Sequence, residues 1–285
     1  MNAVHARCEA AVAPPGSDLR YGLLGLDRDR RQTIIALHAL QRELCAIRET
    51  VSDPAVAVSK LDWWEQELQR LHEGRPQHPV TRALAEGVVR YRLPADELRE
   101  LAAAARMELE YDTYPSFPQF VVYCHRGGSS LALLRTRVLG WTQPDTAAFA
   151  HELGVMEVLA WQLLEVRDLA RSGRCYLPED ELARFGIATG DLLSERGGPE
   201  LAALFRFQAE RIRAYHERAL GYLAAADYPA QAPQLALAEL ILARLAEVEG
   251  DGFRLLHHRL ELTPLRKFWL AWRALRRARR RVRVH

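Results

Sequence analysis

The sequence predicts an all-α protein, a single-domain helical bundle around one core. Apolar residues recur at helical spacing along almost all of the 285 residues. Regularly spaced runs of Val, Ile and Thr bounded by turns, which would indicate strands, are nearly absent. Prolines punctuate the chain close to predicted helix starts, where the missing backbone N–H costs little, and most of the joining loops are short. These three observations favour a bundle over a sheet protein.

The first long helix is predicted over 27–51. Its apolar residues are spaced by three and four, as in a helix with one buried side: Ile34, Leu37, Leu40, Leu44 and Ile47. Asp53 as N-cap and Pro54 at the first helical position then start a second helix, which ends at Gly74. Further helices are predicted at 78–92, 95–112, 117–139, 145–171, 198–226, 232–259 and 264–281. Within 117–139, the run at 127–130 (Gly-Gly-Ser-Ser) is expected to let two helices approach or to bend one.

Three segments are expected: a flexible N-terminal tail at 1–17 containing Pro14 and Pro15, a helical domain at 18–263, and a basic aromatic C-terminal helix or tail at 264–285. No stretch of about 18 uncharged apolar residues is present, so a membrane-spanning helix is not expected. The N-terminus lacks the apolar region of a secretory signal. Four widely spaced cysteines without a CxxC pair suit a reducing cytoplasm, so we expect a cytoplasmic protein.

Charge is unevenly distributed. Nine Lys and Arg residues and no acid follow position 265, which leaves 39 − 9 = 30 basic against 37 acidic residues in the rest of the chain. A basic helix with tryptophans can lie on an anionic membrane surface. The candidate contact residues are Arg266, Lys267, Trp269, Trp272 and Arg273. The alternative is that the tryptophans pack on the bundle and the arginines are simply solvated; nucleic-acid binding is not expected.

Two polar stripes occur on predicted helices. In the mostly apolar helix 145–171, four residues lie within about 80° of one another at 100° per residue: Glu157, Trp161, Glu165 and Asp168. Acids on such a helix either reach solvent or arginine partners, or line a polar internal cavity. A second stripe lies on helix 27–51: His38, Arg42, Cys45 and Glu49. Facing stripes build internal sites in bundles, but spacing alone leaves open whether these two face each other.

The run Gly-Arg-Cys-Tyr-Leu-Pro at 173–178, Trp63-Trp64 in the second helix, and the order of the motifs from about Asp18 to Arg277 resemble the squalene/phytoene synthase family. The resemblance implies an isoprenoid-synthase-type helical bundle with a central cavity. It also implies an activity, the head-to-head joining of two prenyl diphosphates held by Mg²⁺ between aspartates on two opposed helices. Mg²⁺ prefers hard oxygen ligands and neutralises the leaving diphosphate.

Both aspartate-rich motifs are eroded when the family pattern is carried over. Cys45 and Ala46 stand where the leading aspartates of the first motif are expected, and only the later acid survives, as Glu49. In the second motif Glu165 replaces the first aspartate, Leu169 the last, and Trp161 an asparagine. The resemblance implies diphosphate or ligand contacts at Arg42, Cys45, Tyr123, Arg174 and Tyr176, and weak metal candidates at Glu49, Glu165 and Asp168. It assigns no catalytic residue, and Mg²⁺ is the cofactor only if the chain is an enzyme.

The segments 49–53 and 129–131 resemble a motif-degenerate branch that contains the mitochondrial complex I assembly factor 6. The leading hypothesis is therefore a catalytically degenerate member that binds an isoprenoid-like ligand, or respiratory assembly partners, at the membrane surface. It would be cytoplasmic, with peripheral contact to the inner face of the membrane. The alternative is an active Mg²⁺-dependent prenyltransferase that joins two farnesyl or geranylgeranyl diphosphates.

Overall fold

The computed structural model describes residues 3–193 and 198–280. This part of the chain is helical and contains no strand, only an isolated bridge between Thr113 and Cys175. The predicted all-α class is thereby confirmed. The predicted tail and C-terminal segment extend to residues 1–2 and 281–285, which lie outside the described residues.

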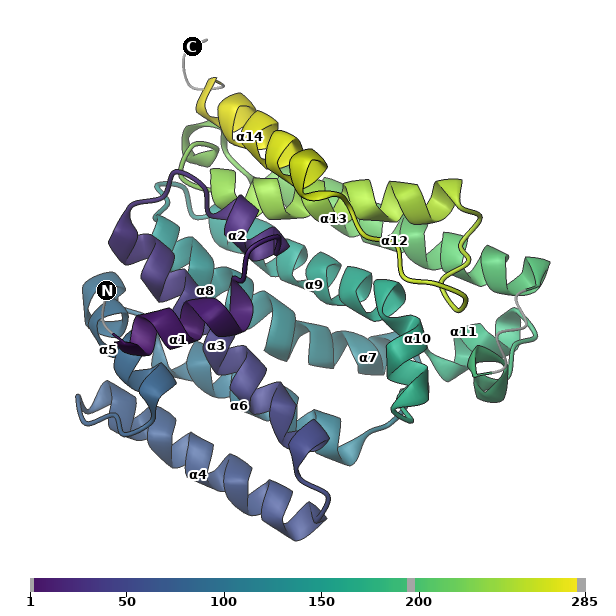
Figure 1. Cartoon of the computed structure of the whole chain (residues 1–285), viewed down its shortest axis with the longest axis horizontal. Coiled ribbons are helices and arrows are strands. Elements are labelled where there is room, and N and C mark those ends of the chain that lie inside the picture. Colours follow the sequence, from purple (N-terminus) through teal and green to yellow (C-terminus); the bar gives the residue numbers. More distant parts are fainter. Residues whose placement is uncertain (1–2, 194–197, 281–285) are drawn as a thin grey trace.

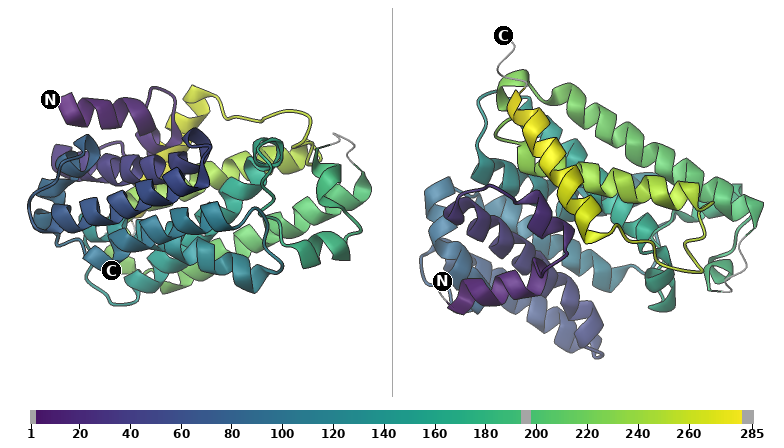
Figure 2. Two further views of the ribbon diagram at one scale, coloured as in Figure 1. Left: turned by 90° about the horizontal axis from the view of Figure 1, so that it is seen from below. Right: turned by 45° about the horizontal axis from the view of Figure 1, so that its top comes forward.

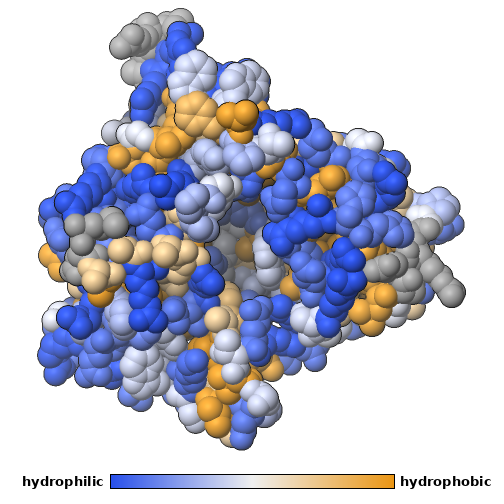
Figure 3. Space-filling view, viewed as in Figure 1, coloured by the Kyte–Doolittle hydropathy of each residue, from blue (hydrophilic) through white to orange (hydrophobic). Residues whose placement is uncertain are grey.

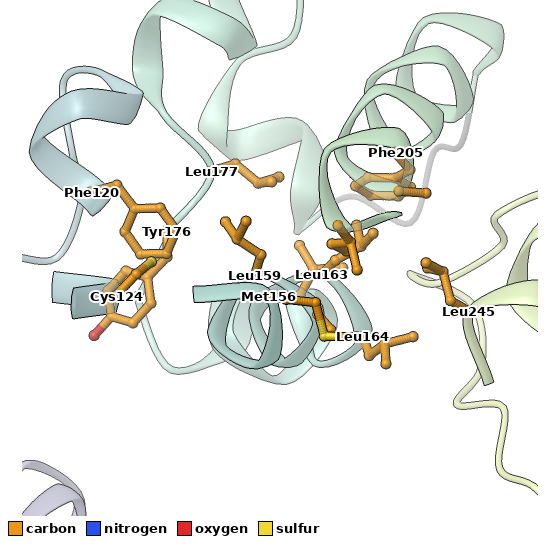
Figure 4. Packing of buried hydrophobic residues seen from close by; sticks show 14 of the residues in the cluster. Phe120, Cys124, Met156, Leu159, Leu163, Leu164, Tyr176, Leu177, Phe205 and Leu245 are labelled. Carbon is orange, nitrogen blue, oxygen red and sulfur yellow. The ribbon is translucent and has the colours of Figure 1, made fainter. Parts of the chain in front are cut away.

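The structure has two large hydrophobic cores, and helix α9 (Thr146–Leu164) belongs to one of them (Figure 1). One core is built mainly by α3 (Arg28–Thr50), α4 (Pro54–His72), α5 (Pro79–Tyr91), α6 (Ala95–Glu110) and α8 (Ser130–Leu139). The other is built mainly by α9, α12 (Pro199–Tyr222) and α13 (Ala232–Gly250), which contributes Ala238, Leu245 and Val248. Figure 4 shows Leu159 and Leu163 of α9 pointing toward Leu177 and Phe205 in this second core. The apolar circumference predicted for α9 is explained by this central position.

The predicted helix at 117–139 is present with a wider turn in its middle. It comprises α7 (Phe117–Tyr123), a π-helical segment (Cys124–Ser129) and α8. Gly128 in the π-helical segment lies against Gly154 of α9 so closely that a Cβ on either glycine would overlap the backbone of the other. The glycines therefore let the two helices approach, as the sequence analysis predicted, and π-helical turns of this kind recur at functional sites.

The prediction of a loose N-terminal tail is wrong for the described residues. Ala3–Val12 form helix α1, which packs on α3 and α5 and buries Cys8. Glu9 accepts hydrogen bonds from Arg20 at 3.3 Å and Arg31 at 2.7 Å. The short α2 (Asp18–Gly22) follows. Local periodicity did not reveal α1, because ion pairs and packing against distant helices hold it in place.

Two predicted helices end earlier than expected. The helix predicted at 145–171 is divided at Glu165 into α9 and α10 (Val166–Arg171), and the helix predicted at 232–259 ends at Gly250. A loop follows in which Phe253 takes the left-handed conformation. A further short helix, α11 (Glu179–Arg184), was not predicted.

Helix α14 (Pro264–Arg280) begins where predicted and lies across α13 and α2, with a small apolar cluster of its own between them (Figures 1 and 2). Trp269 and Trp272 are 51% and 44% exposed, so about half of each side chain faces solvent. No helix in the described ranges is both long and apolar enough to cross a membrane.

Candidate ligand cavity between helices α3 and α9

A cavity of about 450 Å³ lies between α3 and α9, with the end of α1 above it and α6 behind it. Figure 3 shows a hollow near the middle of the face that Figure 1 presents, beside the end of α1. A volume of several hundred Å³ is in the range of ordinary small-molecule sites. The predicted central cavity is therefore present.

Parts of the two polar stripes do face each other across this cavity. The whole stripe of α3 lines it: His38, Arg42, Cys45 and Glu49. From α9, Glu157 and Trp161 line the opposite wall, whereas Glu165 and Asp168 do not. Because the helix is interrupted at Glu165, the two later acids leave the arc on which the first two lie.

Glu165 and Asp168 are directed to a group of arginines instead. Glu165 accepts a hydrogen bond from Arg244 at 3.1 Å and forms an ion pair with Arg259 at 2.9 Å, and Asp168 lies 3.9 Å from Arg259. The pKa of Glu165 is raised, because the effect of burial is larger than the opposite effect of the two arginines. The three weak metal candidates are thus separated, with Glu49 in the cavity and the other two outside it.

A buried ion pair forms one wall. Arg135 of α8 is 2% exposed and donates to both carboxylate oxygens of Glu157 at 2.7 Å. Its Nε donates to Gln234 of α13 at 3.0 Å, and Gln234 in turn bonds Thr136. Both bonds to Glu157 come from the Nη2 atom, and the separate bond from Nε holds the planar guanidinium in a defined orientation. The network therefore ties α8, α9 and α13 together behind the cavity.

His38 faces Arg135, with 3.5 Å between the His38 Nε2 and Arg135 Nη1 atoms. Burial, and secondly the charge of Arg135, lower the pKa of His38 from 6.5 to about 3. The imidazole is therefore neutral at pH 7, and it can accept a hydrogen bond or donate one at this wall of the cavity.

This lowered pKa predicts a loss of stability in acid. Below pH 6.5 the unfolded chain binds a proton at His38 that the folded chain does not, so the free energy of unfolding falls as the pH drops from about 6.5 toward 3. In His38→Gln this part of the pH dependence should be flattened, as measured by urea unfolding at pH 7, 6, 5 and 4. Exposed His257→Gln is the control. An equal slope in wild type and His38→Gln would contradict the prediction.

The back of the cavity holds a buried acid that the sequence analysis missed. Glu108 of α6 is 2% exposed and accepts a hydrogen bond from the hydroxyl of Tyr123 at 2.5 Å. Its second oxygen is buried without a hydrogen-bond partner. Burial raises the pKa of Glu108 and that of Cys45 beside it, so both groups favour their neutral forms. Cys45 is thus a small polar wall residue and a poor nucleophile.

The arginines predicted to bind a diphosphate lie near the mouth. Arg174 donates to Glu49 at 3.1 Å, and its side chain is only 9% exposed whereas that of Glu49 is 60% exposed. Arg42 donates to the backbone carbonyl of Ala11, at the end of α1. Helix α1 is therefore held over the cavity by one of the residues that the family resemblance assigns to the ligand.

Tyr176 contributes to the cavity indirectly. It is 1% exposed, and its ring lies 5.6 Å from that of Tyr123 and 6.2 Å from that of Trp161, centre to centre. Figure 4 shows the Tyr176 ring beside Phe120, on the core side of α9. Of the five predicted ligand residues, four line the cavity and Tyr176 supports the aromatic wall behind it.

The missed residues carried a weaker signal in the sequence. Arg135 is a charged residue in the mostly apolar α8, where a charge needs a partner, whereas Glu108 is one of several charged residues of α6 and its burial is not marked by its neighbours. Nothing in the spacing indicated which partner, because Arg135 meets Glu157 of the next long helix and Glu108 meets Tyr123 beyond a loop.

The carboxylates that face the cavity do not fit a magnesium cluster, because each already has a partner. Glu157 gives both oxygens to Arg135, Glu49 is bound by Arg174, and Glu108 accepts a hydrogen bond from Tyr123. Mg²⁺ requires charged oxygen ligands in near-octahedral geometry. Within residues 3–193 and 198–280, no three His, Cys, Asp or Glu side chains are grouped so that they could hold a metal ion.

The fold and the cavity define a helical protein of the isoprenoid-synthase type. The family model for squalene/phytoene synthase matches residues 13–266, so the chain belongs to this family. It is 29% identical over 272 residues to the phytoene synthase of Mycobacterium tuberculosis, with 94% of this chain and 89% of that protein covered. It is 28% identical over 282 residues to the 15-cis-phytoene synthase of Synechococcus elongatus, with 94% and 91% covered.

Solved structures share the fold. A dehydrosqualene synthase in complex with a ligand superimposes with a TM-score of 0.84 at 20% identity, over 97% of this chain and 96% of that one. The squalene synthase HpnC from Alicyclobacillus acidocaldarius gives a TM-score of 0.76 at 21% identity, over 88% and 94%. The predicted isoprenoid-synthase-type architecture is therefore confirmed.

Proposed function

We propose that this chain binds a prenyl diphosphate-like ligand in the cavity between α3 and α9, and that it does so without joining two such ligands. The observation that carries this proposal is the pairing of every cavity carboxylate with an arginine or a tyrosine of the protein itself. Ionisation of a diphosphate needs strong electrostatic stabilisation of the leaving group. Carboxylates that are already neutralised are poor anchors for the cations that would supply it.

The cavity nevertheless suits an anionic amphiphile. Arg174 and Arg42 are at the mouth, where a diphosphate would stay partly in water, and Arg binds phosphate with paired hydrogen bonds. Since Glu49 is largely exposed, a phosphate can replace it at Arg174 with a small cost in free energy for breaking the ion pair. Leu131, Val158 and Trp161 line the interior and would contact the hydrocarbon chain.

A second candidate is the active Mg²⁺-dependent prenyltransferase. It is favoured by the curated relatives, which are phytoene synthases and match about nine-tenths of the chain. For this candidate, Glu49 would have to leave Arg174 before it could serve as a metal ligand. An assay of pyrophosphate release separates the two candidates.

We also propose an assembly role and a cellular location for this chain. A role with respiratory assembly partners rests on the resemblance of segments 49–53 and 129–131 alone. A cytoplasmic location with peripheral membrane contact rests on cysteine usage and the basic C-terminal helix.

The test uses the full-length protein with farnesyl and geranylgeranyl diphosphate, in Mg²⁺ and in EDTA. We expect saturable binding by calorimetry in both conditions and no release of pyrophosphate. Arg174→Ala should weaken binding by about 10- to 100-fold, the worth of a charge-assisted hydrogen bond. Arg259→Ala is the matched control, because Arg259 pairs with Glu165 outside the cavity.

Two results would overturn the proposal. Mg²⁺-dependent pyrophosphate release that Glu49→Gln abolishes would establish the transferase. Equal losses of affinity in Arg174→Ala and Arg259→Ala, or no binding by the wild type, would exclude the cavity as the ligand site.

A further inference from the structure

Helix α14 has two unlike sides. The inner side packs on α13 and α2 and buries six residues: Lys267, Leu270, Ala271, Ala274, Leu275 and Ala278. The outer side exposes four large apolar residues: Leu265 (83%), Phe268 (49%), Trp269 (51%) and Trp272 (44%). At 100° per residue these four lie within an arc of about 100°. We call them the aromatic stripe.

Cationic groups accompany the aromatic stripe. The guanidinium of Arg273 lies 4.4 Å from the ring centre of Trp269, and that of Arg276 lies 4.5 Å from that of Trp272. Residues 264–280 contain no acid. A surface hollow of about 270 Å³ is lined by Trp272 and four arginines: Arg273, Arg276, Arg277 and Arg280.

We propose that this outer side of α14 docks on an anionic lipid bilayer. A helix with aromatic side chains along one face and arginines at its edges lies in the interface, its rings at the acyl boundary and its guanidinium groups on the phosphates. Arg273 and Arg277 also contact Glu239 of α13, so Arg276 and Arg280 are the cations of this hollow that would bind lipid phosphate groups. Exposed tryptophans favour this occupant because their rings combine an apolar body with a polar N–H.

The structure changes which residues make the contact. Lys267, expected at the membrane from the sequence, is buried and bonds Asp18 at 2.8 Å on the protein side. Arg266 pairs with Glu247 of α13. Arg273 likewise bonds Glu239 of α13. These three residues therefore fasten α14 to the body, while Phe268 and Arg276 join Trp269 and Trp272 on the docking side.

The docking side and the cavity mouth share one face of the molecule. Figures 1 and 2 place α14 and α1 on the same side, with α14 in front of α13, and Figure 3 shows the hollow on that face. Docking through α14 would turn the mouth toward the bilayer. We therefore extend the proposal: an isoprenoid ligand enters the cavity from the lipid phase. This extension rests on the proposed ligand-binding function, whereas the docking itself does not.

Docking is tested with the full-length protein and vesicles of phosphatidylcholine, with or without 30% phosphatidylglycerol. We expect sedimentation with the anionic vesicles only, and its loss in 0.5 M salt. Trp269→Ala/Trp272→Ala should bind at least tenfold more weakly, and Arg276→Gln about fivefold. Trp63→Ala, an exposed tryptophan of α4, is the matched control. Circular dichroism verifies that each variant is folded.

Three outcomes would overturn the docking proposal: equal binding to neutral vesicles, equal binding by the stripe variant and the Trp63 control, or binding of duplex DNA in place of vesicles. Ligand entry is tested separately, by extraction of geranylgeranyl diphosphate from anionic vesicles. Trp269→Ala/Trp272→Ala should lose extraction and keep its affinity for soluble farnesyl diphosphate, whereas Arg174→Ala should still dock. A stripe variant that extracts at the wild-type rate would overturn the entry route. If no variant or wild type binds farnesyl diphosphate, the ligand proposal fails while the docking result stands.

Discussion

Gly154→Ala is expected to destabilise the protein severely, by about 3 kcal/mol or more. The new Cβ would overlap the carbonyl group of Gly128 and the Cα atom of Ser129, which are backbone atoms and cannot turn aside as a side-chain end can. The small gain in helix propensity, up to about 1 kcal/mol, does not offset this overlap. Helix α9 would have to move away from the π-helical segment, and Gly128 itself lines the cavity.

The measurement is the free energy of unfolding in urea together with the melting temperature, which should fall by roughly 5–10 °C. Gly221→Ala is the matched control. Gly221 is in α12 with no atom near its absent Cβ, so this substitution should be neutral or stabilising by about 0.5 kcal/mol. Equal stabilities for the two variants would mean that α9 and the π-helical segment are not in close contact. A folded Gly154→Ala should also have weakened ligand binding.

The second large effect is expected from Arg135→Ala, at about 3–5 kcal/mol, because removing one member of a buried pair leaves the other charge uncompensated. Glu157 would lose both of its short hydrogen bonds and Gln234 would lose one. The side chain of Glu157 is only 16% exposed, so water cannot fully replace the guanidinium.

A double variant separates the charge effect from a simple loss of packing. Arg135→Met/Glu157→Gln keeps the approximate volume of both side chains and removes both charges, so it should regain most of the lost stability. Arg259→Ala removes a half-exposed arginine and leaves Glu165 paired with Arg244, so it should change stability by less than about 1 kcal/mol. If the double variant is as unstable as Arg135→Ala, the pair contributes through shape and not through charge.

The Arg135–Glu157 pair also bears on function. It lies where α8 and α9 enclose the cavity, and it holds one acid of the α9 stripe in a neutral pair. A buried ion pair that stabilises little overall can still define how helices are arranged. We interpret it as the feature that keeps this wall of the cavity polar.

The sequence by itself determined the helices and their buried sides. Apolar spacing along α3 and the Asp53-Pro54 start of α4 require only neighbours within one or two turns, and the structure has both elements within a residue or two of the prediction. The stripe of α3 was also readable, because angular position on a helix follows from residue number. The same calculation of angular position predicted that Glu157 and Trp161 lie on one face of α9.

Only the tertiary structure determined which residues the polar stripes of α3 and α9 contact. Whether Glu165 stays on the arc of Glu157 depends on a helix break that spacing does not show, and Arg174 reaches Glu49 across 125 residues of chain. The folding of α1 likewise depends on Arg31 and Arg42, to which its residues bond. The physical reason is that helical periodicity fixes directions around one axis, whereas hydrogen bonds and ion pairs depend on how separate axes are packed.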